Sequence, residues 1–134
     1  MSIADVMTRD LPTCSPDDRL GAVARRMTEG GVKAIPVCEG ERLVGIVTDW
    51  DVTRAVGRED SAAERRVADY MSTDLATASP ETSFGEVAEL MAERRLHHLL
   101  ISEDERFVGM VHLDVDWSDL GGIAGPIATF TAPI

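Results

Sequence analysis

The sequence predicts an α+β protein built from two tandem β-α-β-β-α repeats, related by a pseudo-twofold axis, with the sheets packed together and the helices outside. The first observation behind this prediction is internal repetition. Shifted by 64 residues, the chain aligns with itself without a gap from Ile3 to Val47, and about 19 of the 45 aligned positions are identical. Self-similarity at a fixed period marks a duplicated structural unit. The second observation is size, because a unit of about 60 residues buries too little surface alone, so the copies should share one core.

The bulk properties are those of a compact domain. The chain has 134 residues, of which 44% are hydrophobic and 28% are charged, as is ordinary for globular proteins. No apolar run approaches the ~20 residues of a membrane span, and no secretory signal precedes the first repeat, so we expect a cytoplasmic location. The net charge of −11, from 24 acidic and 13 basic residues, argues against nonspecific nucleic-acid binding. A phosphate-bearing ligand must therefore find a local basic cluster.

Each repeat opens with a helical turn that ends at Met7 or Met71, followed by a short extended segment, 12–14 or 76–78. A Ser-Pro pair then predicts an N-cap and the first position of a helix, at Ser15 and again at Ser79. Apolar residues at helical spacing follow, which predicts one buried stripe on each helix and marks the methionines as core. The stripe residues are Leu20, Val23, Ala24 and Met27 in the first copy, and Phe84, Val87, Ala88 and Met91 in the second.

Two apolar runs separated by an acidic turn come next in each copy. In the first copy they are 34–37 and 43–47, with the turn at 39–41, a pattern that predicts a β-hairpin. The chain then enters a second helix, from Asp49 to about Val56, and a polar linker joins the copies. The predicted division is 1–60 for the first repeat, 61–120 for the second and 121–134 for an apolar tail.

The junction between strand 43–47 and the second helix carries the clearest candidate for chemistry. Thr48 and Asp51 have the spacing of a capping box, which satisfies free amides at a helix start. The same hydroxyl and carboxylate, at the end of a strand beside a helix N-terminus, suit the hydroxyls of a ribose and a nearby phosphate. Both roles can hold together. The second copy has His112 and Val115 at these positions, with Asp114 and Asp116 displaced on either side, so we expect one good site per chain.

Catalytic and metal-binding motifs are missing from the sequence. It contains no HExxH, GxSxG or P-loop pattern, and the adjacent His97 and His98 do not have metal-ligand spacing, so we expect neither an enzyme nor a metal site. Cys14 and Cys38 lack CxxC spacing. They lie in extended segments that should be neighbours, which leaves a disulfide and two buried thiols as alternatives.

Residues 2 to about 116 resemble a cystathionine β-synthase (CBS) domain pair, also called a Bateman module. The resemblance is carried by the duplication, by Val32-Lys33-Ala34-Ile35-Pro36-Val37, and by the Gly-hydrophobic-Val-Thr-x-x-Asp stretch that ends at Asp51. It implies a stand-alone, non-catalytic regulatory module. Such a module binds AMP, ADP, ATP or S-adenosylmethionine in a cleft between the repeats and signals to an effector protein. It needs no cofactor, and Mg²⁺ would enter only together with ATP. The alternative is a ligand-independent dimeric scaffold with vestigial clefts.

The resemblance also assigns residues and an assembly. Apolar helix faces imply a homodimer, with no nucleic-acid or membrane partner. Ribose contacts are assigned to Thr48 and Asp51, and phosphate contacts to Lys33, His97 and His98. The adenine wall is assigned to Thr13, Cys14, Ile35, Pro36 and Val37, which are also expected core residues.

The tail 117–134 is unlike either repeat. Its glycines break any helix, and it ends in an uncharged, mildly alternating segment. An apolar end of this kind would cover a cleft, cap a sheet edge or pack on another subunit. Disorder is the remaining alternative.

Overall fold

A computed structural model describes residues 2–114 and 130–131, and it confirms the α+β class and the duplicated order. The first repeat comprises the 3-10 turn η1 (Ile3–Asp5), α1 (Leu20–Gly30), β1 (Ala34–Glu39), β2 (Arg42–Thr48) and α2 (Asp49–Arg58). The second comprises η2 (Ala62–Glu64), η3 (Val67–Asp69), β3 (Thr77–Ala78), α3 (Phe84–Arg94), β4 (His98–Glu103) and β5 (Arg106–Leu113), and β6 (Phe130–Thr131) follows.

The two repeats agree down to the irregularities of their hairpins. Strands β1 and β2 pair antiparallel with a register shift between Val37 and Cys38. Strands β4 and β5 pair in the same way, and their shift falls at the equivalent positions, between Ile101 and Ser102. The acidic turns predicted between the apolar runs therefore form hairpins in both copies. Equivalent bulges bend both hairpins alike.

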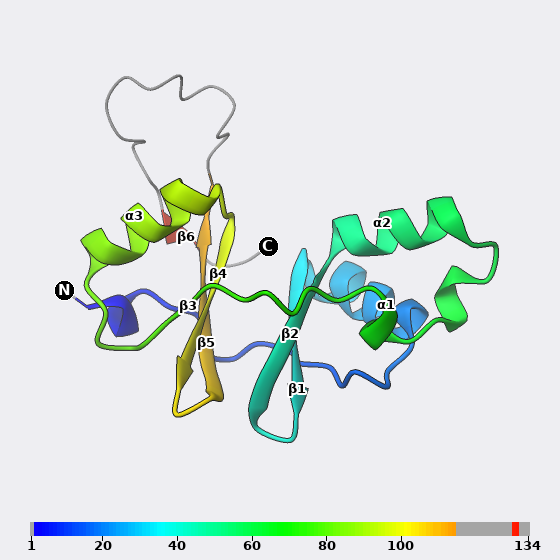
Figure 1. The fold of residues 1–134 in the computed structure, drawn as a ribbon, viewed down its shortest axis with the longest axis horizontal. Coiled ribbons are helices and arrows are strands. Elements are labelled where there is room, and N and C mark those ends of the chain that lie inside the picture. The colour runs from blue at the N-terminus through cyan, green and yellow to red at the C-terminus, as the bar shows by residue number, and fades with distance from the viewer. Residues whose placement is uncertain (1, 115–129, 132–134) are drawn as a thin grey trace.

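The hairpins meet at their turn ends and form one sheet in the order β1-β2-β5-β4-β3, with β6 paired to β5. The Leu43 amide donates to the Glu105 carbonyl (3.0 Å), and the Phe107 amide donates to the Glu41 carbonyl (3.1 Å). Each bond is the pseudo-twofold mate of the other. Helices lie outside: α3 flanks one hairpin, and α1 and α2 flank the other (Figure 1). An apolar cluster drawn from both repeats fills the centre; its buried members are Ala34, Leu100 and Met110.

The lead-in turn of each repeat packs on the other repeat. The Ile3 amide donates to the Thr82 carbonyl at 3.2 Å. At the equivalent positions, the Val67 amide donates to the Asp18 carbonyl at 2.8 Å. Accordingly, Ile3 belongs to the core of the second repeat and Val67 to that of the first. Figure 1 shows this exchange, with the N-terminal turn beside α3 rather than beside α1.

The same exchange explains one wrong prediction. Each first helix begins four residues later than its Ser-Pro pair predicts, and the N-cap of α1 is Arg19 instead of Ser15. The Ser15 amide donates to the Asp18 carboxylate (2.9 Å), while the Asp18 carbonyl accepts the Val67 amide. These bonds commit residues 15–18 to a turn whose backbone groups serve the other repeat. The stripes are confirmed in part: Leu20, Val23, Met27, Val87 and Met91 are buried, whereas Ala24, Phe84 and Ala88 are only partly buried.

Most of the predicted tail lies outside the described residues, as does the second helix that the duplicated order implies for the second copy. Within 117–134, the structure describes only β6, which pairs antiparallel with β5 opposite His112 and Leu113. None of the helices in the described part of the chain has both the length and the apolar character needed to cross a bilayer.

We predict that replacing Gly45, or its repeat equivalent Gly109, with alanine will weaken the packing of the exchanged lead-in turns on the hairpins. A Cβ at Gly45 would lie 2.9 Å from both the Met71 sulfur and the Ser72 carbonyl oxygen, and one at Gly109 would lie 2.8 Å from the Met7 sulfur. Because backbone must shift, Gly45→Ala should lower the free energy of unfolding by about 1–3 kcal/mol, measured by urea denaturation.

The control is Gly57→Ala, since a Cβ at this helical glycine meets no atom within 4 Å. It should be neutral or stabilise the fold by up to about 1 kcal/mol. If the Gly45→Ala and Gly57→Ala variants have equal free energies of unfolding, the exchanged segments are not tightly packed against the hairpins.

Candidate functional site

A cleft of about 360 Å³ opens between the repeats, and its lining residues come largely in equivalent pairs. Both halves of the chain therefore build it around the pseudo-twofold axis, and we call it the axial cleft. The structure brings together here Thr48 and the three residues assigned to phosphate. The pairs are Lys33 with His97, Thr48 with His112, Asp49 with Leu113, and Trp50 with Asp114, and His98 completes the lining.

Equivalent backbone hydrogen bonds hold the two walls of the axial cleft. The Asp49 amide donates to the Lys33 carbonyl (3.0 Å), and the Leu113 amide donates to the His97 carbonyl (2.8 Å). Each bond ties the end of a hairpin to its beginning. The basic side chains of Lys33 and His97 are thereby set at matching positions in the cleft.

The amino end of α2 forms part of the wall, and the predicted capping box is present. The Asp51 carboxylate accepts the Thr48 amide (2.8 Å) and the Thr48 hydroxyl (3.1 Å), while the Asp51 amide donates to that hydroxyl (3.4 Å). Asp49 and Trp50, the first two residues of the helix, line the cleft. The positive end of the helix dipole thus adds to the attraction for an anion.

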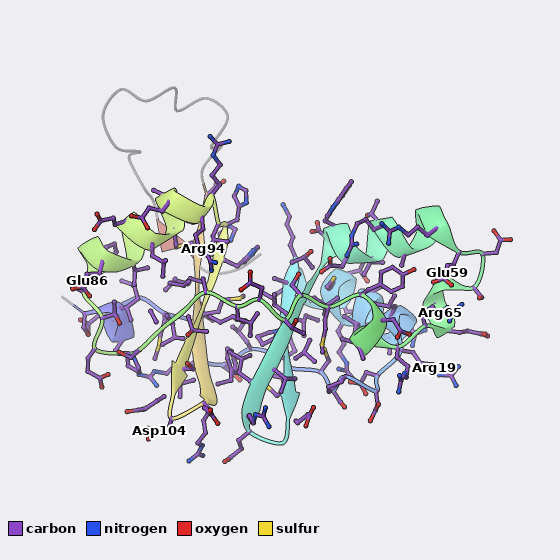
Figure 2. The ribbon with its side chains drawn as sticks, viewed as in Figure 1. Arg19, Glu59, Arg65, Glu86, Arg94 and Asp104 are labelled. Atoms are coloured by element: carbon purple, nitrogen blue, oxygen red, sulfur yellow. The ribbon has the colours of Figure 1, made fainter. Side chains whose placement is uncertain are left out.

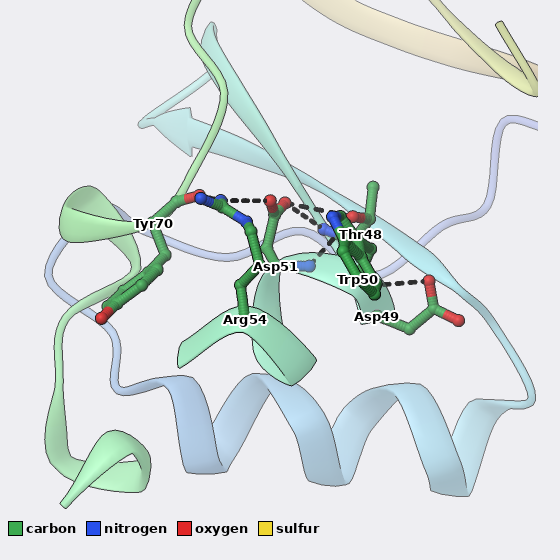
Figure 3. A network of polar contacts seen from close by, with 6 residues as sticks. All are labelled: Thr48, Asp49, Trp50, Asp51, Arg54 and Tyr70. Carbon is green, nitrogen blue, oxygen red and sulfur yellow. Dashed lines mark hydrogen bonds and ion pairs between the residues drawn. The ribbon is translucent and has the colours of Figure 1, made fainter. Parts of the chain in front are cut away.

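Asp51 is 5% exposed and is not among the residues that line the axial cleft. Its second oxygen, Oδ1, accepts a bond from Arg54 Nη2 at 2.8 Å. Arg54 also donates to the Tyr70 carbonyl (3.4 Å) and lies over the Tyr70 ring, 5.8 Å from its centroid; Figure 3 shows these groups together. A carboxylate has about four acceptor positions, and three are filled here. A ribose could claim two of them only if Arg54 gave one up.

The network continues into the linker between the repeats. The Tyr70 hydroxyl donates to the Glu59 carboxylate at 2.6 Å, and Glu59 pairs with Arg65. Figure 2 shows Glu59 and Arg65 near each other at the far end of α2. A chain of polar contacts therefore connects Asp51, beside the axial cleft, with the linker.

The residues assigned to the adenine wall are not brought to the axial cleft. Ile35 and Val37 are fully buried in the core of the first repeat, together with Cys14, and Pro36 is also buried. Both faces of β1 are covered, so this strand presents no open wall. Thr13 is exposed but lines a different cleft, of about 440 Å³, at the turn ends of the hairpins.

The two cysteines are free and buried, so the disulfide alternative is not realised. Cys14 forms an isolated parallel bridge with Val37, and the Cys38 amide donates to the Cys14 carbonyl at 2.8 Å, so the two residues are neighbours along the backbone without being bonded through sulfur. Cys14 packs in the core, whereas Cys38 lines the hairpin-end cleft. Burial, reinforced by the nearby Asp18, raises the pKa of the Cys14 thiol to about 12, and burial also raises the pKa of Cys38.

His98 and His112 form a cross-strand pair in the axial cleft. They stand directly opposite each other on β4 and β5, with ring centroids 4.7 Å apart. His98 Nε2 and His112 Nδ1 are buried without a hydrogen-bond partner. Burial, followed by the charges of His112, His97 and Lys33, lowers the pKa of His98 to about 4. Burial also lowers the pKa of His112, against an opposing effect of Asp114, so both rings are neutral near pH 7.

Sequence reasoning did not count His112 as a site residue, because it read this position as a lost threonine. The signal was nevertheless available, since His112 is the repeat equivalent of Thr48. Within residues 2–114 and 130–131, no three His, Cys, Asp or Glu side chains gather as a metal site.

Comparison with known proteins establishes the family. The CBS domain model matches residues 3–58 and again residues 67–114. The CBS domain-containing protein YhcV of Bacillus subtilis is 32% identical over 112 residues, which cover 84% of this chain and 80% of that protein. The chain belongs to the CBS domain family and carries two copies of the domain. It is also 35% identical to inosine-5′-monophosphate dehydrogenase of Methanocaldococcus jannaschii, but it spans only 21% of that enzyme.

Solved structures share the fold. A putative acetoin utilization protein, AcuB, from Vibrio cholerae superposes with a TM-score of 0.79 at 23% identity, covering 84% of each chain. CBSX2 in complex with AMP gives 0.75 at 21% identity, covering 83% of this chain and 89% of that one. The CBS domain pair of MJ0100, in complex with 5′-methylthioadenosine and S-adenosyl-L-methionine, gives 0.75 at 21% identity, covering 84% and 89%.

We predict that His98 makes stability depend on pH. Its folded-state pKa lies below the unfolded value of 6.5, so on acidification the unfolded chain binds the proton first. Stability should fall as the pH drops from about 6.5 to about 4, by roughly 2–3 kcal/mol from this group. Urea denaturation at several pH values measures the effect.

His98→Ala isolates this contribution, because the many carboxylates titrate alike in both proteins. The variant should be less stable than wild type near pH 7, through lost packing, and the gap should narrow or reverse near pH 4.5. A gap that stays constant across this range would contradict the assignment.

Proposed function

We propose that this chain is a non-catalytic regulatory module that binds an adenine-containing ligand, such as AMP, ADP, ATP or S-adenosylmethionine, between its two CBS repeats and signals to a partner protein. The observation that carries the proposal is the axial cleft. Equivalent residues of both repeats meet there, and the basic side chains of Lys33 and His97 stand beside the amino end of α2. In a chain of net charge −11, such a cluster is the local attraction that a phosphate requires.

The ligands of the structural neighbours point to the same class. One neighbour is a complex with AMP, and another holds 5′-methylthioadenosine and S-adenosyl-L-methionine; all three contain adenosine. The dehydrogenase relative does not favour an enzyme, because the match covers only about a fifth of its length. Neither a cytoplasmic location nor an effector protein is identified by these similarities, and both stay predictions.

In the proposed complex, Lys33, His97 and His98 contact phosphate, and Thr48 and Asp51 contact ribose. Asp51 can accept both ribose hydroxyls when Arg54 yields one of the oxygens that it now occupies. The buried members of the adenine wall would become accessible to a ligand only if β1 separated from its neighbours. The residues assigned to this adenine wall are Thr13, Cys14, Ile35, Pro36 and Val37. Mg²⁺ would bind only together with ATP.

The second candidate is a ligand-independent dimeric scaffold, and exposed apolar side chains on α2 favour dimerisation in either case. Trp50 and Val56 on α2 are large apolar side chains with 65% and 66% of their surface exposed. An apolar groove of about 130 Å³ lies between α1 and α2, with Val56 and Val52 in its lining. Burial of such a surface stabilises association, so we propose a homodimer.

Calorimetric titration with AMP, ADP, ATP and S-adenosylmethionine, with and without Mg²⁺, tests the function. Lys33 is the only lysine of the chain, so acylation of its amine, followed by mass spectrometry, reports where a ligand sits. Binding of an adenine ligand that slows acylation of Lys33 supports the regulatory module. A dimer in sedimentation that binds none of these ligands would favour the scaffold.

We predict that Asp51→Asn weakens adenine-ligand binding about ten- to hundredfold, because charge-assisted hydrogen bonds to ribose are worth roughly 1.5–3 kcal/mol. The variant should also lose about 1 kcal/mol or more of stability, through the weaker capping box and the lost pairing with Arg54. Calorimetric titration and urea denaturation measure the two effects separately.

Asp5→Asn is the matched control. Asp5 accepts the Ser2 amide (2.9 Å) in a capping box of the same kind, and it does not line the axial cleft. It should bind ligand as wild type does. If folded Asp51→Asn also binds normally, Asp51 serves only as a cap.

A further inference from the structure

We infer that the axial cleft selects ligands that carry a phosphoryl group and takes up a proton when it binds them, with the His98–His112 pair as the acceptor of that proton. This inference rests on the proposed function and specifies its ligand class. It depends on a feature that the first repeat does not have, since Ala34 and Thr48 occupy the positions equivalent to His98 and His112.

The geometry of the pair sets the chemistry. The two rings face each other from directly opposed strand positions, 4.7 Å apart, and both line the axial cleft. One nitrogen of each ring, His98 Nε2 and His112 Nδ1, is buried and has no partner. A neutral imidazole has one donor and one acceptor nitrogen, and after protonation both nitrogens donate. Protonation would therefore add a donor and a positive charge to a ring that lies in the lining of the cleft.

The groups around the pair decide when protonation is favourable. The basic neighbours of the pair are Lys33, ahead of β1, and His97, ahead of β4. Asp114 follows β5 and Asp49 begins α2, and both line the same cleft. The short strand β6, which pairs with β5 opposite His112, contributes no titratable residue. Burial is the largest cause at both rings, and at His112 it prevails over the opposing effect of Asp114, so both rings are neutral near pH 7.

An anion reverses this balance. A phosphoryl group brings between one and two negative charges and three strong acceptor oxygens, which can accept from an imidazolium and from Lys33 together. Two rings this close repel each other when both are charged, so the pair should bind one proton and titrate as a unit. The proton comes from solvent and is released when the ligand leaves.

The same reasoning ranks the ligands. Adenosine offers the cleft no anion, and S-adenosylmethionine brings a sulfonium cation toward Lys33. Adenosine therefore cannot stabilise a protonated pair, and the single carboxylate of S-adenosylmethionine is offset by its sulfonium and ammonium charges. AMP, ADP and ATP can, so their affinity should rise as the pH falls through neutrality, whereas that of adenosine should stay constant.

The test is calorimetric titration of the full chain with AMP and with adenosine, at about pH 6.5 and about pH 7.5, in two buffers that differ in ionisation enthalpy. For AMP we expect uptake of close to one proton and an affinity that falls roughly three- to tenfold per pH unit. The phosphate of AMP itself titrates near pH 6. The diagnostic quantity is therefore the difference between wild type and a variant with the same ligand.

The variant is His98→Ala combined with His112→Thr, which gives the second repeat the residues that the first repeat already accommodates. It should bind AMP more weakly and without proton uptake. Asp5→Asn, which changes a capping box that does not line the axial cleft, keeps the pair and should keep the proton uptake. Proton uptake that persists in the double variant would overturn the assignment to this pair. AMP binding without uptake in wild type would overturn the inference and leave the proposed function standing, whereas absence of any adenine ligand would overturn both.

Discussion

The exchange of lead-in turns is the constraint on which the rest of this structure depends. The Ile3 and Val67 amides bond to carbonyls of the opposite repeat, and their side chains complete the opposite core. Neither half can therefore be removed or rotated without opening the other. The hairpins pair with each other at their turn ends, where Arg42 stands opposite Arg106, and they share a small apolar cluster. The exchanged segments thus supply much of what fixes the pseudo-twofold axis and, with it, the axial cleft.

The axial cleft has a nearly symmetric backbone, but the side chains on its two walls differ. Its two walls are held by equivalent hydrogen bonds, yet one wall presents a hydroxyl at a helix start and the other presents imidazoles. Duplication provides a scaffold in which each position occurs twice, and substitution in one copy then creates chemistry that a strictly symmetric cleft would not have. His112 illustrates this, because its backbone place is that of Thr48 while its side chain pairs with His98.

Asp51 shows a conflict between stability and binding. Its carboxylate caps α2 and holds Arg54, and Arg54 in turn contacts Tyr70, which follows η3 in the lead-in turn of the second repeat. A ligand that draws Asp51 toward its ribose would loosen Arg54 and hence that contact. In the proposed regulatory function, the same few contacts that stabilise the module would connect ligand occupancy with the segment that joins its halves.

Local patterns in the sequence were enough to determine the duplication, the α+β class, the hairpins, the buried helix faces and the capping box at Thr48, because each depends on spacing along a single stretch of chain. The exchange of lead-in turns could not be read in this way. Both copies carry nearly the same lead-in, so packing on its own repeat and packing on the other leave the same sequence pattern, and the late start of α1 at Leu20 follows from that choice. The burial of both faces of β1, which keeps Ile35 and Val37 away from any ligand, is likewise seen only in the tertiary structure. The tertiary structure also set Arg54 against Asp51 and placed His98 opposite His112. The distances between these groups depend on three-dimensional packing and on hairpin register. The spacing of residues along one stretch of chain does not determine either of these.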